Sequence, residues 1–459
     1  MPDQTAPHDA GAAPPGARVL IASHSHPMVQ NGGSEIASHG LFERVRDQPG
    51  WAAWYLGCTR GQSYVRPGQS ITQPFADDDY LYTVGDFEGF RFANRDTAYP
   101  RDLRALLRKL DPQIVHFHHY VNFGMETFFH VRDTLPDAQL VLTLHEFLAI
   151  CHQQGQMVTR QAGALCHRAD PVACTRCFPE AQPADFFLRR LYADRFLAYV
   201  DHFVAPSRFL AERYIAWGLP AEKVSVIENV PRAAPLLPHA AVSRVEDTRA
   251  AASLRIGFFG QISELKGISV LLGAAELLEQ DGRADIAFAI HGDHTNQPAA
   301  FQAEFLERIG KAGSNVAFHG AYANAEVDAL MQGIDLVVVP SVWWENSPVV
   351  IQEAFRNGRA VVCSDIGGMA EKVAPGETGV HFRVGSARAL ADALTGLAAD
   401  PARVAALGAT ARTRWDGEAP LDSHLRLYRS LLPASASASA SDAVSDLGSV
   451  RPAPRFGHG

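Results

Sequence analysis

Short apolar segments alternate with longer helical patterns along most of the chain, and this alternation constrains the fold more than any other feature. Segments such as 18–22, 113–117 and 139–143 are continuous runs rich in branched apolar residues. Buried parallel strands have this character, whereas half-exposed strands alternate apolar and polar residues. Repeated strand–helix–strand units build a doubly wound parallel sheet. The sequence therefore predicts an α/β protein.

The alternation is interrupted once, and this break indicates two domains. Pro231, Pro235 and Pro238 lie among alanines, a charged stretch follows, and strand–helix alternation starts again at Leu254. A chain of 459 residues is also too long for one ordinary domain. We predict a disordered N-terminus (1–16), a first Rossmann-like domain (17–235), a linker near 232–253, a second Rossmann-like domain (254–432) and a disordered tail (433–459).

Composition and charge exclude several classes of protein. The chain has 41 Lys and Arg against 50 Asp and Glu, a net charge of -9, which argues against nucleic acid as the main partner. No apolar run approaches the length of about 20 residues that spans a bilayer. The N-terminus lacks the basic and apolar regions of a signal peptide. We expect a cytoplasmic protein, in which the six cysteines are reduced.

The first segment with chemical potential is Glu345-Asn-Ser-Pro-Val-Val-Ile-Gln-Glu353, which follows an apolar strand at 335–340. Ser347 suits an N-cap and Pro348 suits the first helical position, so we expect a helix to begin at one of them. The free amides and the dipole of such a helix could hold a diphosphate. The two carboxylates could accept hydrogen bonds from sugar or ribose hydroxyls. The alternative is a surface helix with ordinary acidic residues.

Two glycine turns follow other strands. The loop from Gly260 to Gly267 contains Lys266, which would place a cation beside a phosphate. The turn at 31–35 contains Gly32 and Gly33 before a helical pattern and could cradle a phosphate or a sugar. Taken singly, each turn is equally typical of an ordinary strand–helix corner.

Histidines mark the ends of two predicted strands in the first domain. His116, His118 and His119 end one strand, and His145 with Glu146 follows the next. The carboxyl ends of parallel strands meet at one edge of a sheet, so these side chains predict a polar cleft. A single histidine is more often structural, whereas two clusters at equivalent positions favour a functional role.

Together these features resemble the retaining GT-B glycosyltransferases of family four, the glycosyl transferases group 1, over about residues 18–432. The Gly-Gly-x-Glu turn at 32–35, the Lys-Gly loop at 260–267 and the Glu-x(7)-Glu pair at 345–353 occur in the family's order. The resemblance implies two Rossmann-like domains facing each other across a cleft. It also implies metal-independent transfer of a sugar, with retention, from a nucleotide-diphosphate sugar to a hydroxyl acceptor. Surface polysaccharide or glycan synthesis is the implied setting.

The resemblance also assigns roles to single residues. It implies catalytic roles for His118 and Glu345, with Glu345 near the donor sugar, and places the nucleobase near the turn after His319. His145 and Glu146 would lie on the acceptor side. The implied donor-binding residues are Gly33, Gln261, Lys266, Ser347, Pro348, Val349 and Glu353. Gln261 stands where the family usually has arginine and supplies no charge, which leaves the donor open.

Four cysteines form a separate feature within an insertion at 151–177. Cys151, Cys166, Cys174 and Cys177 have the spacing Cys-x(14)-Cys-x(7)-Cys-x-x-Cys. Four cysteines with one Cys-x-x-Cys pair are compatible with a structural zinc site. Unligated thiols, a redox pair and an iron–sulfur cluster are the alternatives. Beside the cleft of the first domain, this insertion would shape the acceptor side.

Three further hypotheses follow from the sequence. The segment 186–199 mixes aromatic residues with arginine, which predicts either core packing or contact with the inner face of a membrane that carries a lipid-linked acceptor. Gln261 leaves open a non-catalytic nucleotide-sugar-binding protein on a decayed GT-B fold. An epimerase or phosphorylase would share the architecture without the glutamate pair. No Gly-x-Gly-x-x-Gly turn is present, which disfavours a nicotinamide oxidoreductase.

Overall fold

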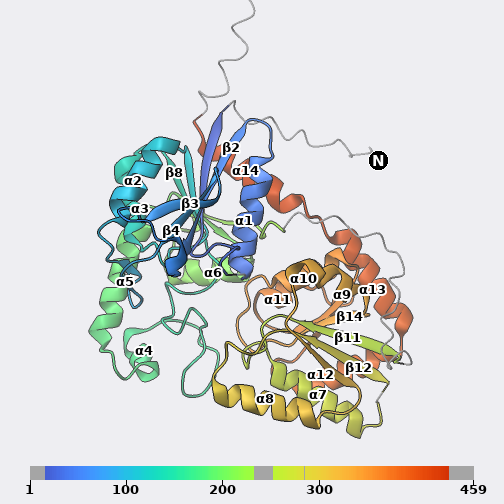
Figure 1. Ribbon diagram of the computed structural model, residues 1–459. Helices are drawn as coiled ribbons and strands as arrows, with labels where there is room; N and C mark the ends of the chain where they lie inside the picture. Colours follow the sequence, from blue (N-terminus) through green and yellow to red (C-terminus); the bar gives the residue numbers. More distant parts are fainter. Residues whose placement is uncertain (1–15, 31, 232–251, 284, 434–459) are drawn as a thin grey trace, which may run out of the picture.

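The computed structural model describes residues 16–30, 32–231, 252–283 and 285–433, and these form two α/β lobes (Figure 1). The predicted linker, tail and N-terminus lie almost wholly outside the described residues. Each lobe is built on one sheet with helices on its faces, as the strand–helix alternation predicts. The predicted α/β class with two Rossmann-like domains is therefore confirmed.

The sheet of the first lobe has the strand order β10-β9-β8-β7-β1-β2-β4-β3. Its neighbouring strands pair in parallel, except for the antiparallel pair β3–β4. Its strands are β1 (Ala17–Ala22), β2 (Trp51–Thr59), β3 (Ile71–Ala76), β4 (Asp79–Thr83), β7 (Ile114–Phe117), β8 (Gln139–Thr143), β9 (His202–Ala205) and β10 (Val224–Val226), with a separate β5 (Phe87–Glu88) and β6 (Ala93–Asn94). Its helices are α1 (Gly33–Arg46), α2 (Tyr99–Leu110), α3 (Glu126–Thr134), α4 (Pro171–Cys177), α5 (Pro183–Leu197) and α6 (Arg208–Trp217).

The sheet of the second lobe is parallel, with the order β13-β12-β11-β14-β15-β16. Its strands are β11 (Leu254–Phe259), β12 (Ile286–His291), β13 (Val316–Gly320), β14 (Leu336–Val339), β15 (Ala360–Ser364) and β16 (Gly379–Phe382). The helices after β11 are α7 (Ile268–Gln280), α8 (Ala299–Lys311), α9 (Val327–Gln332), α10 (Val349–Arg356), α11 (Gly367–Lys372), α12 (Ala387–Ala398), α13 (Pro401–Arg414) and α14 (Ala419–Leu431).

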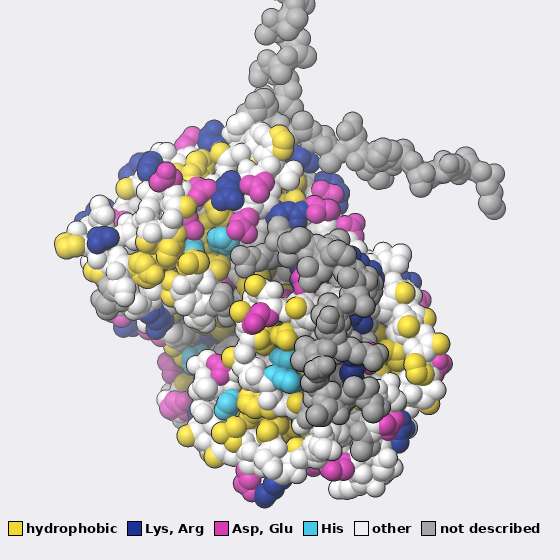
Figure 2. All heavy atoms as spheres, turned by 45° about the vertical axis from the view of Figure 1, so that its right-hand side comes forward, with side chains coloured by type: hydrophobic (Ala, Val, Ile, Leu, Met, Phe, Trp, Pro, Cys, Tyr) yellow, Lys and Arg dark blue, Asp and Glu magenta, His cyan; other side chains and the backbone are white. Residues whose placement is uncertain are grey.

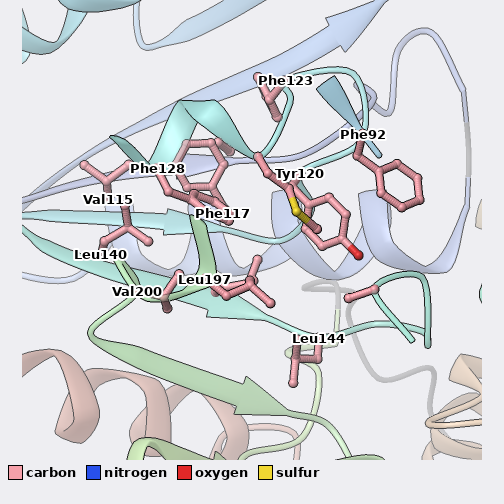
Figure 3. Close-up of a cluster of buried hydrophobic side chains, with 14 of the residues drawn as sticks. Phe92, Val115, Phe117, Tyr120, Phe123, Phe128, Leu140, Leu144, Leu197 and Val200 are labelled. Carbon is pink, nitrogen blue, oxygen red and sulfur yellow. The ribbon is translucent and has the colours of Figure 1, made fainter. Parts of the chain in front are cut away.

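Apolar clusters cover both faces of each sheet, which explains why the strands read as continuous apolar runs. On one face of the first sheet, Phe117 of β7 packs edge to face against Phe123 and Phe128 (Figure 3). Such aromatic pairs fix the position of the chain that follows β7. That chain begins with His118 and His119, so the core holds the histidines in place.

Helix α14, the last among the described residues, returns to the first lobe (Figure 1). Leu421, Leu425 and Tyr428 of α14 are buried in the same cluster as strand β1. The Tyr428 hydroxyl lies 2.6 Å from Nδ1 of His116, whose Nε2 lies 2.7 Å from Thr143 Oγ1. The range that the sequence assigns to the second domain therefore ends in a helix of the first. An apolar stripe at helical spacing makes this possible, because it can cover an open sheet face of either lobe.

None of the helices in the described part of the chain combines the length and the apolar composition that crossing a bilayer needs. Helix α5 nevertheless has an unusual distribution of side chains. Phe187, Leu188 and Leu191 are exposed on its outer face. Arg189 is buried on its inner face and donates to the carbonyls of neighbouring loops. The core packing expected of this segment is thus only partly realised, because Arg189 is buried, where backbone carbonyls accept its hydrogen bonds, while apolar side chains are exposed.

Candidate active site

The loop between β14 and α10 carries the predicted glutamate pair. Helix α10 begins at Val349 with Pro348 as its N-cap, and no side chain caps it. The prediction that Ser347 is the N-cap is wrong, because its hydroxyl donates to Glu228 of the first lobe instead. The amides of the first turn of α10 therefore have no side-chain partner in the part of the chain that the structure describes. An anion could occupy this position, because uncapped amides and the helix dipole favour negative charge.

Lys266 and Glu345 form an ion pair at the centre of this region. The Lys266 Nζ lies 2.5 Å from Glu345 Oε1. The same oxygen accepts hydrogen bonds from Ser341 Oγ and Trp343 Nε1, each at 2.9 Å. Glu345 is buried, and the Lys266 ammonium lies 5.7 Å from the centre of the Trp343 ring. Two predicted site residues, 79 positions apart, thus hold one another.

A glycine allows the two loops to meet. Gly267 has a left-handed backbone with φ of 74° and precedes helix α7. A Cβ at this position would lie 1.9 Å from the carbonyl oxygen of Pro340, so no other residue fits without moving the backbone. Val342 also donates its amide to the carbonyl of Leu265 at 2.9 Å. The glycine that the sequence suggested for a ligand contact therefore brings Lys266 to Glu345.

Glu353 lies further along α10, and its carboxylate has no hydrogen-bond partner among the described residues. Burial raises the pKa of Glu353 to about 7; Arg356 lowers this pKa and Asp328 raises it, both to a smaller extent. A partly buried carboxylate without a partner is costly unless a ligand supplies donors. The position is suited to accepting hydrogen bonds from the two hydroxyls of a ribose.

The histidines of the first lobe form the opposite wall. His118 Nδ1 lies 3.0 Å from His145 Nε2, and the buried His118 Nε2 has no partner among the described residues. Burial lowers the pKa of His145 to about 4 and lowers the pKa of His118 well below its usual value. Both rings are therefore neutral at physiological pH. A neutral imidazole with one free nitrogen can bond a sugar oxygen without carrying charge.

A second chain of ionisable groups lies next to these histidines. His119 Nε2 lies 2.8 Å from Glu146 Oε1, and His24 Nε2 lies 3.2 Å from Glu35 Oε1. The rings of His24 and His119 are 4.3 Å apart. Glu35 comes from the first turn of α1, and Glu146 follows β8. The predicted His145–Glu146 pair thus belongs to a polar floor at the carboxyl ends of β1, β7 and β8, where ligands of doubly wound sheets bind.

Contacts across the two lobes bring both walls together. Asn346, directly after Glu345, donates its side-chain amide to the carbonyl of His145. A Cβ on Gly33 would lie 3.7 Å from Cγ2 of Val349, so the glycine turn faces the start of α10. Gln261 is exposed and takes no part in the described contacts of the Lys266–Glu345 cluster. The structure therefore groups most of the predicted residues between the two lobes and leaves Gln261 exposed outside this group.

Flat rings lie near the predicted nucleobase position. The His291 ring stacks on Phe259 with centroids 5.0 Å apart, and His319 stacks on His291 at 4.6 Å. Tyr322 meets Phe259 edge on at 5.9 Å. The outermost ring, His319, is exposed, and Figure 2 shows histidine side chains on the surface of both lobes. An exposed ring of this kind offers a stacking surface to a base.

Two protein-family models match this chain. A model named "Glycosyl transferases group 1" matches residues 253–400, and a model named "Glycosyltransferase Family 4" matches residues 70–230. The two matches cover most of both lobes and include His118, Lys266 and Glu345. The chain belongs to the group 1 glycosyltransferases.

Curated relatives match this group 1 glycosyltransferase over about a third of its length. It is 32% identical over 158 residues to the D-inositol 3-phosphate glycosyltransferase of Corynebacterium aurimucosum, covering 34% of this chain and 37% of the relative. It is 30% identical over 166 residues to the alpha-maltose-1-phosphate synthase of Mycolicibacterium smegmatis, covering 35% of this chain and 42% of the relative. The matched segments thus span less than half the length of these relatives.

Solved structures match over almost the whole chain and establish the fold. Anabaena HepE in complex with UDP and glucose has a TM-score of 0.62 and 18% identity, covering 91% of this chain and all of that one, 100%. Sucrose-phosphate synthase from Thermosynechococcus elongatus has a TM-score of 0.68 and 18% identity, covering 90% and 99%. The group 1 glycosyltransferase described here therefore has the GT-B fold.

Several residues of the cleft were not predicted from the sequence. Ser341 and Trp343 hold the carboxylate of Glu345, and Glu228 accepts from Ser347 and pairs with Lys372. Glu371 accepts the amides of Arg208 and Phe209 at the start of α6, at 2.8 and 2.9 Å. The sequence signal for Trp343 was available, since it lies in the loop that carries Glu345. The partners of Glu228 and Glu371 lie in the other lobe and leave no local signal.

The four cysteines lie in one region, and their sulfurs are spaced more widely than in a zinc site. Burial raises the pKa of Cys151 and of Cys174, and the neighbouring Cys166 raises both further. Among the described residues, no three of the sulfurs lie within 4.8 Å of one another. A zinc–sulfur bond of about 2.3 Å would require sulfurs about 3.8 Å apart. Zinc binding by Cys151, Cys166, Cys174 and Cys177 thus stays a prediction. It requires the four sulfur atoms to lie closer together than they do in this structure.

A different group meets that distance criterion. His26, His39 and Asp79 place one ligand atom each within 4.8 Å of one another. However, the Met28 amide donates to His26 Nδ1 at 3.0 Å, which puts the ring proton on Nε2, 2.9 Å from Asp79 Oδ2. A metal on Nε2 would need that proton on Nδ1, where it would face the amide hydrogen. This group is therefore a hydrogen-bonded support for the loop after β1.

The zinc prediction is tested by metal analysis of protein purified under reducing conditions. About one zinc per chain is expected, and Cys174→Ser combined with Cys177→Ser should remove it. Cys363→Ser, which changes a buried cysteine in β15, is the matched control and should leave the zinc content unchanged. Wild-type protein without zinc would leave the cysteines as partly buried thiols.

The sequence predicts that Glu353 binds the donor, and its raised pKa then predicts that donor affinity depends on pH. The ionised carboxylate can accept two hydroxyl donors, whereas the protonated form keeps one oxygen for its own proton. Affinity for a nucleotide sugar should therefore rise as the pH increases through about 7, the pKa of Glu353. Isothermal calorimetry on either side of this pH measures the effect, and Glu353→Gln should abolish the dependence. An unchanged pH profile in that variant would exclude Glu353 as its source.

Proposed function

We propose that this group 1 glycosyltransferase transfers a sugar with retention from a nucleotide-diphosphate sugar to a hydroxyl acceptor. The observation that carries the proposal is the Lys266–Glu345 pair, which lies beside the uncapped start of α10 and faces the histidine wall of the other lobe. Cation, amides and neutral imidazoles are the groups that a departing diphosphate and its sugar require. Glycan or surface polysaccharide synthesis is the proposed setting.

The diphosphate would bind between Lys266 and the first turn of α10. Negative charge grows on this group as its bond to the anomeric carbon breaks, so fixed positive charge lowers the barrier. Ser347, Pro348 and Val349 would shape the start of the helix against it, and Gly33 would close over it from the first lobe. We propose that these groups supply the charge stabilisation and that the chemistry proceeds without a bound metal.

The sugar would lie between His118 and Glu345. The free Nε2 of His118 would bond a sugar oxygen, and Glu345 would hold Lys266 in place while remaining near the sugar. The acceptor oxygen would bond the anomeric carbon on the face that the diphosphate leaves. Its proton would pass to an oxygen of the departing phosphate, so no protein nucleophile is needed. His145 and Glu146 would line the acceptor side of this space.

The nucleoside is proposed by analogy and is the first point to test. The neighbouring structures of HepE contain UDP or UDP-glucose, which makes a UDP-sugar the first donor to try. Glu353 would hold the ribose, and the ring stack ending in His319 would face the base. A non-catalytic nucleotide-sugar-binding protein is the second candidate, because Gln261 removes a charge that the family usually has.

A thermal-shift panel of UDP, GDP, ADP and their sugars tests both candidates. A ligand that binds only the folded state raises the melting temperature. We expect one nucleoside to stabilise the wild type, and Lys266→Ala to remove that stabilisation. Lys311→Ala, which removes an exposed lysine paired with Glu307 on α8, is the matched control and should change nothing. No stabilisation by any nucleotide would overturn the proposed function.

Turnover separates an enzyme from a binding protein. With the stabilising donor and a panel of acceptors or water, Glu345→Ala should lower kcat about a hundredfold or more, because Lys266 loses its partner. The fold should remain intact, as judged by circular dichroism. Near-normal turnover in this variant would remove Glu345 from the mechanism. Binding without turnover in the wild type would favour the non-catalytic alternative.

We also propose that the outer face of α5 rests on a lipid surface that carries the acceptor. Phe187, Leu188 and Leu191 are 58%, 45% and 55% exposed on one stripe, and Arg195 is exposed on the same side. The outward stripe of a surface helix is normally polar. Apolar side chains beside arginine are suited to an anionic bilayer surface.

Vesicle sedimentation tests this membrane contact. Wild-type protein should sediment with vesicles of phosphatidylcholine and phosphatidylglycerol, and Phe187→Ser combined with Leu191→Ser should weaken this at least about fivefold. Leu306→Ser on α8 of the other lobe, where the side chain is 48% exposed, is the matched control. Equal sedimentation of the double variant and the wild type would contradict the contact.

A further inference from the structure

Trp344 lies between Trp343 and Glu345 in the loop 340–348 that joins β14 to α10, which we call the donor loop, but its ring packs inside the other lobe. Its side chain is 6% exposed and joins the main apolar cluster of the first domain. All other buried members of that cluster come from residues 20–219. A residue of the second domain therefore completes the core of the first. Because its neighbours Trp343 and Glu345 both contact Lys266, the position of this ring bears directly on the proposed donor site.

Three residues form a socket around the ring. The Trp344 ring lies 5.4 Å from His167 and 5.0 Å from Phe209, and the Arg213 guanidinium lies 5.2 Å from its centroid. Arg213 also donates to the carbonyl of His167 at 3.1 Å and lies 5.0 Å from the Phe209 ring. We call these three residues the Trp344 socket. Their mutual contacts make the socket a preformed site rather than an incidental surface.

The socket connects two parts of the first domain. Phe209 and Arg213 belong to α6, whereas His167 directly follows Cys166 in the cysteine-rich insertion. The start of α6 is also held from the second domain, since Glu371 accepts the amides of Arg208 and Phe209. The insertion, which sequence reasoning placed only on the acceptor side, therefore touches the loop that carries Glu345.

The donor loop alternates between the two domains. Trp343 and Glu345 direct their side chains to Lys266 of the second domain. Trp344 and Asn346 direct theirs to the first domain, the latter to the carbonyl of His145. A shift of Trp344 would therefore displace both groups that hold the Lys266 ammonium. Displacements of about 1 Å in such groups can cost a hundredfold in rate.

We propose that Trp344 is a positioning residue for donor binding, and that the cysteine-rich insertion acts on the donor site through it. This inference rests on the proposed function. The anchored ring fixes the loop, the loop fixes Glu345, and Glu345 fixes Lys266 for the diphosphate. Trp344 Nε1 is buried without a hydrogen-bond partner among the described residues, so the ring acts by packing and by its contact with Arg213.

Donor affinity and stability together distinguish positioning from simple core packing. Calorimetry well below each melting temperature measures the Kd for the nucleoside diphosphate that stabilises the wild type. Trp344→Ala should raise this Kd and the KM for the donor about tenfold or more. Trp344→Phe keeps an aromatic face toward Arg213 and should remain within about threefold of the wild type.

Trp51→Ala is the matched control. Trp51 is 8% exposed, lies in another apolar cluster of the first domain, and also has a buried Nε1 without a partner. Its removal should lower the melting temperature as much as Trp344→Ala does while leaving the donor Kd unchanged. A wild-type Kd and KM in Trp344→Ala, with a similar loss of stability, would overturn the inference.

Two milder variants act on the socket while leaving the tryptophan in place. Arg213→Ala and His167→Ala should each raise the donor Kd about threefold or more, although neither residue touches Lys266 or Glu345. These variants decide the question if Trp344→Ala does not fold, and unchanged affinity in both would reject the inference. Wild-type protein that binds no nucleoside diphosphate would reject the proposed function itself, and this inference with it.

Discussion

The ion pair between Lys266 and Glu345 is the contact on which the arrangement of the cleft depends. A buried carboxylate is stable only with donors around it, and Glu345 receives three, from Lys266, Ser341 and Trp343. Each donor comes from a loop at the carboxyl edge of the second sheet. The pair therefore fixes two loops at once, and Gly267 allows their backbones to approach closely enough.

Contacts between the lobes extend this arrangement. Ser347 and Lys372 meet Glu228, Asn346 meets the carbonyl of His145, and Trp344 enters the core of the first lobe. Polar bonds of this kind are directional, whereas the buried ring supplies apolar contact. Together they set the distance between the histidine wall and the start of α10. The two halves of the proposed site are thus held by the same residues that hold the domains together.

Burial gives the two walls of the cleft different electrostatic character. The first lobe presents histidines whose pKa values are lowered, such as His145 at about 4, so these rings are neutral. The second lobe presents Lys266 and the uncapped start of α10. A ligand with a diphosphate at one end and a neutral sugar at the other matches this division. The distribution follows from desolvation, which disfavours charge on the deeply buried rings.

The sequence by itself determined the fold class and much of the candidate site. Continuous apolar runs such as 18–22 and 254–259 became central strands, because a strand covered on both faces needs no polar residues. Gly33 and Lys266 could be selected because each stands at a strand–helix corner, and Glu353 because it follows Glu345 at a fixed spacing on the helix after a strand. The roles assigned to them beyond this position came from resemblance rather than from local pattern.

Only the tertiary structure decided which of these residues meet. Lys266 and Glu345 are 79 positions apart, Ser347 and Glu228 are 119 apart, and Arg208 and Glu371 are 163 apart. The tertiary structure also packs α14 against the first lobe, leaves Gln261 exposed, and places Trp344 beside the insertion. Local pattern records whether a side chain is apolar and how its backbone turns. It does not record the partner, because that depends on how two separately folded sheets pack against each other.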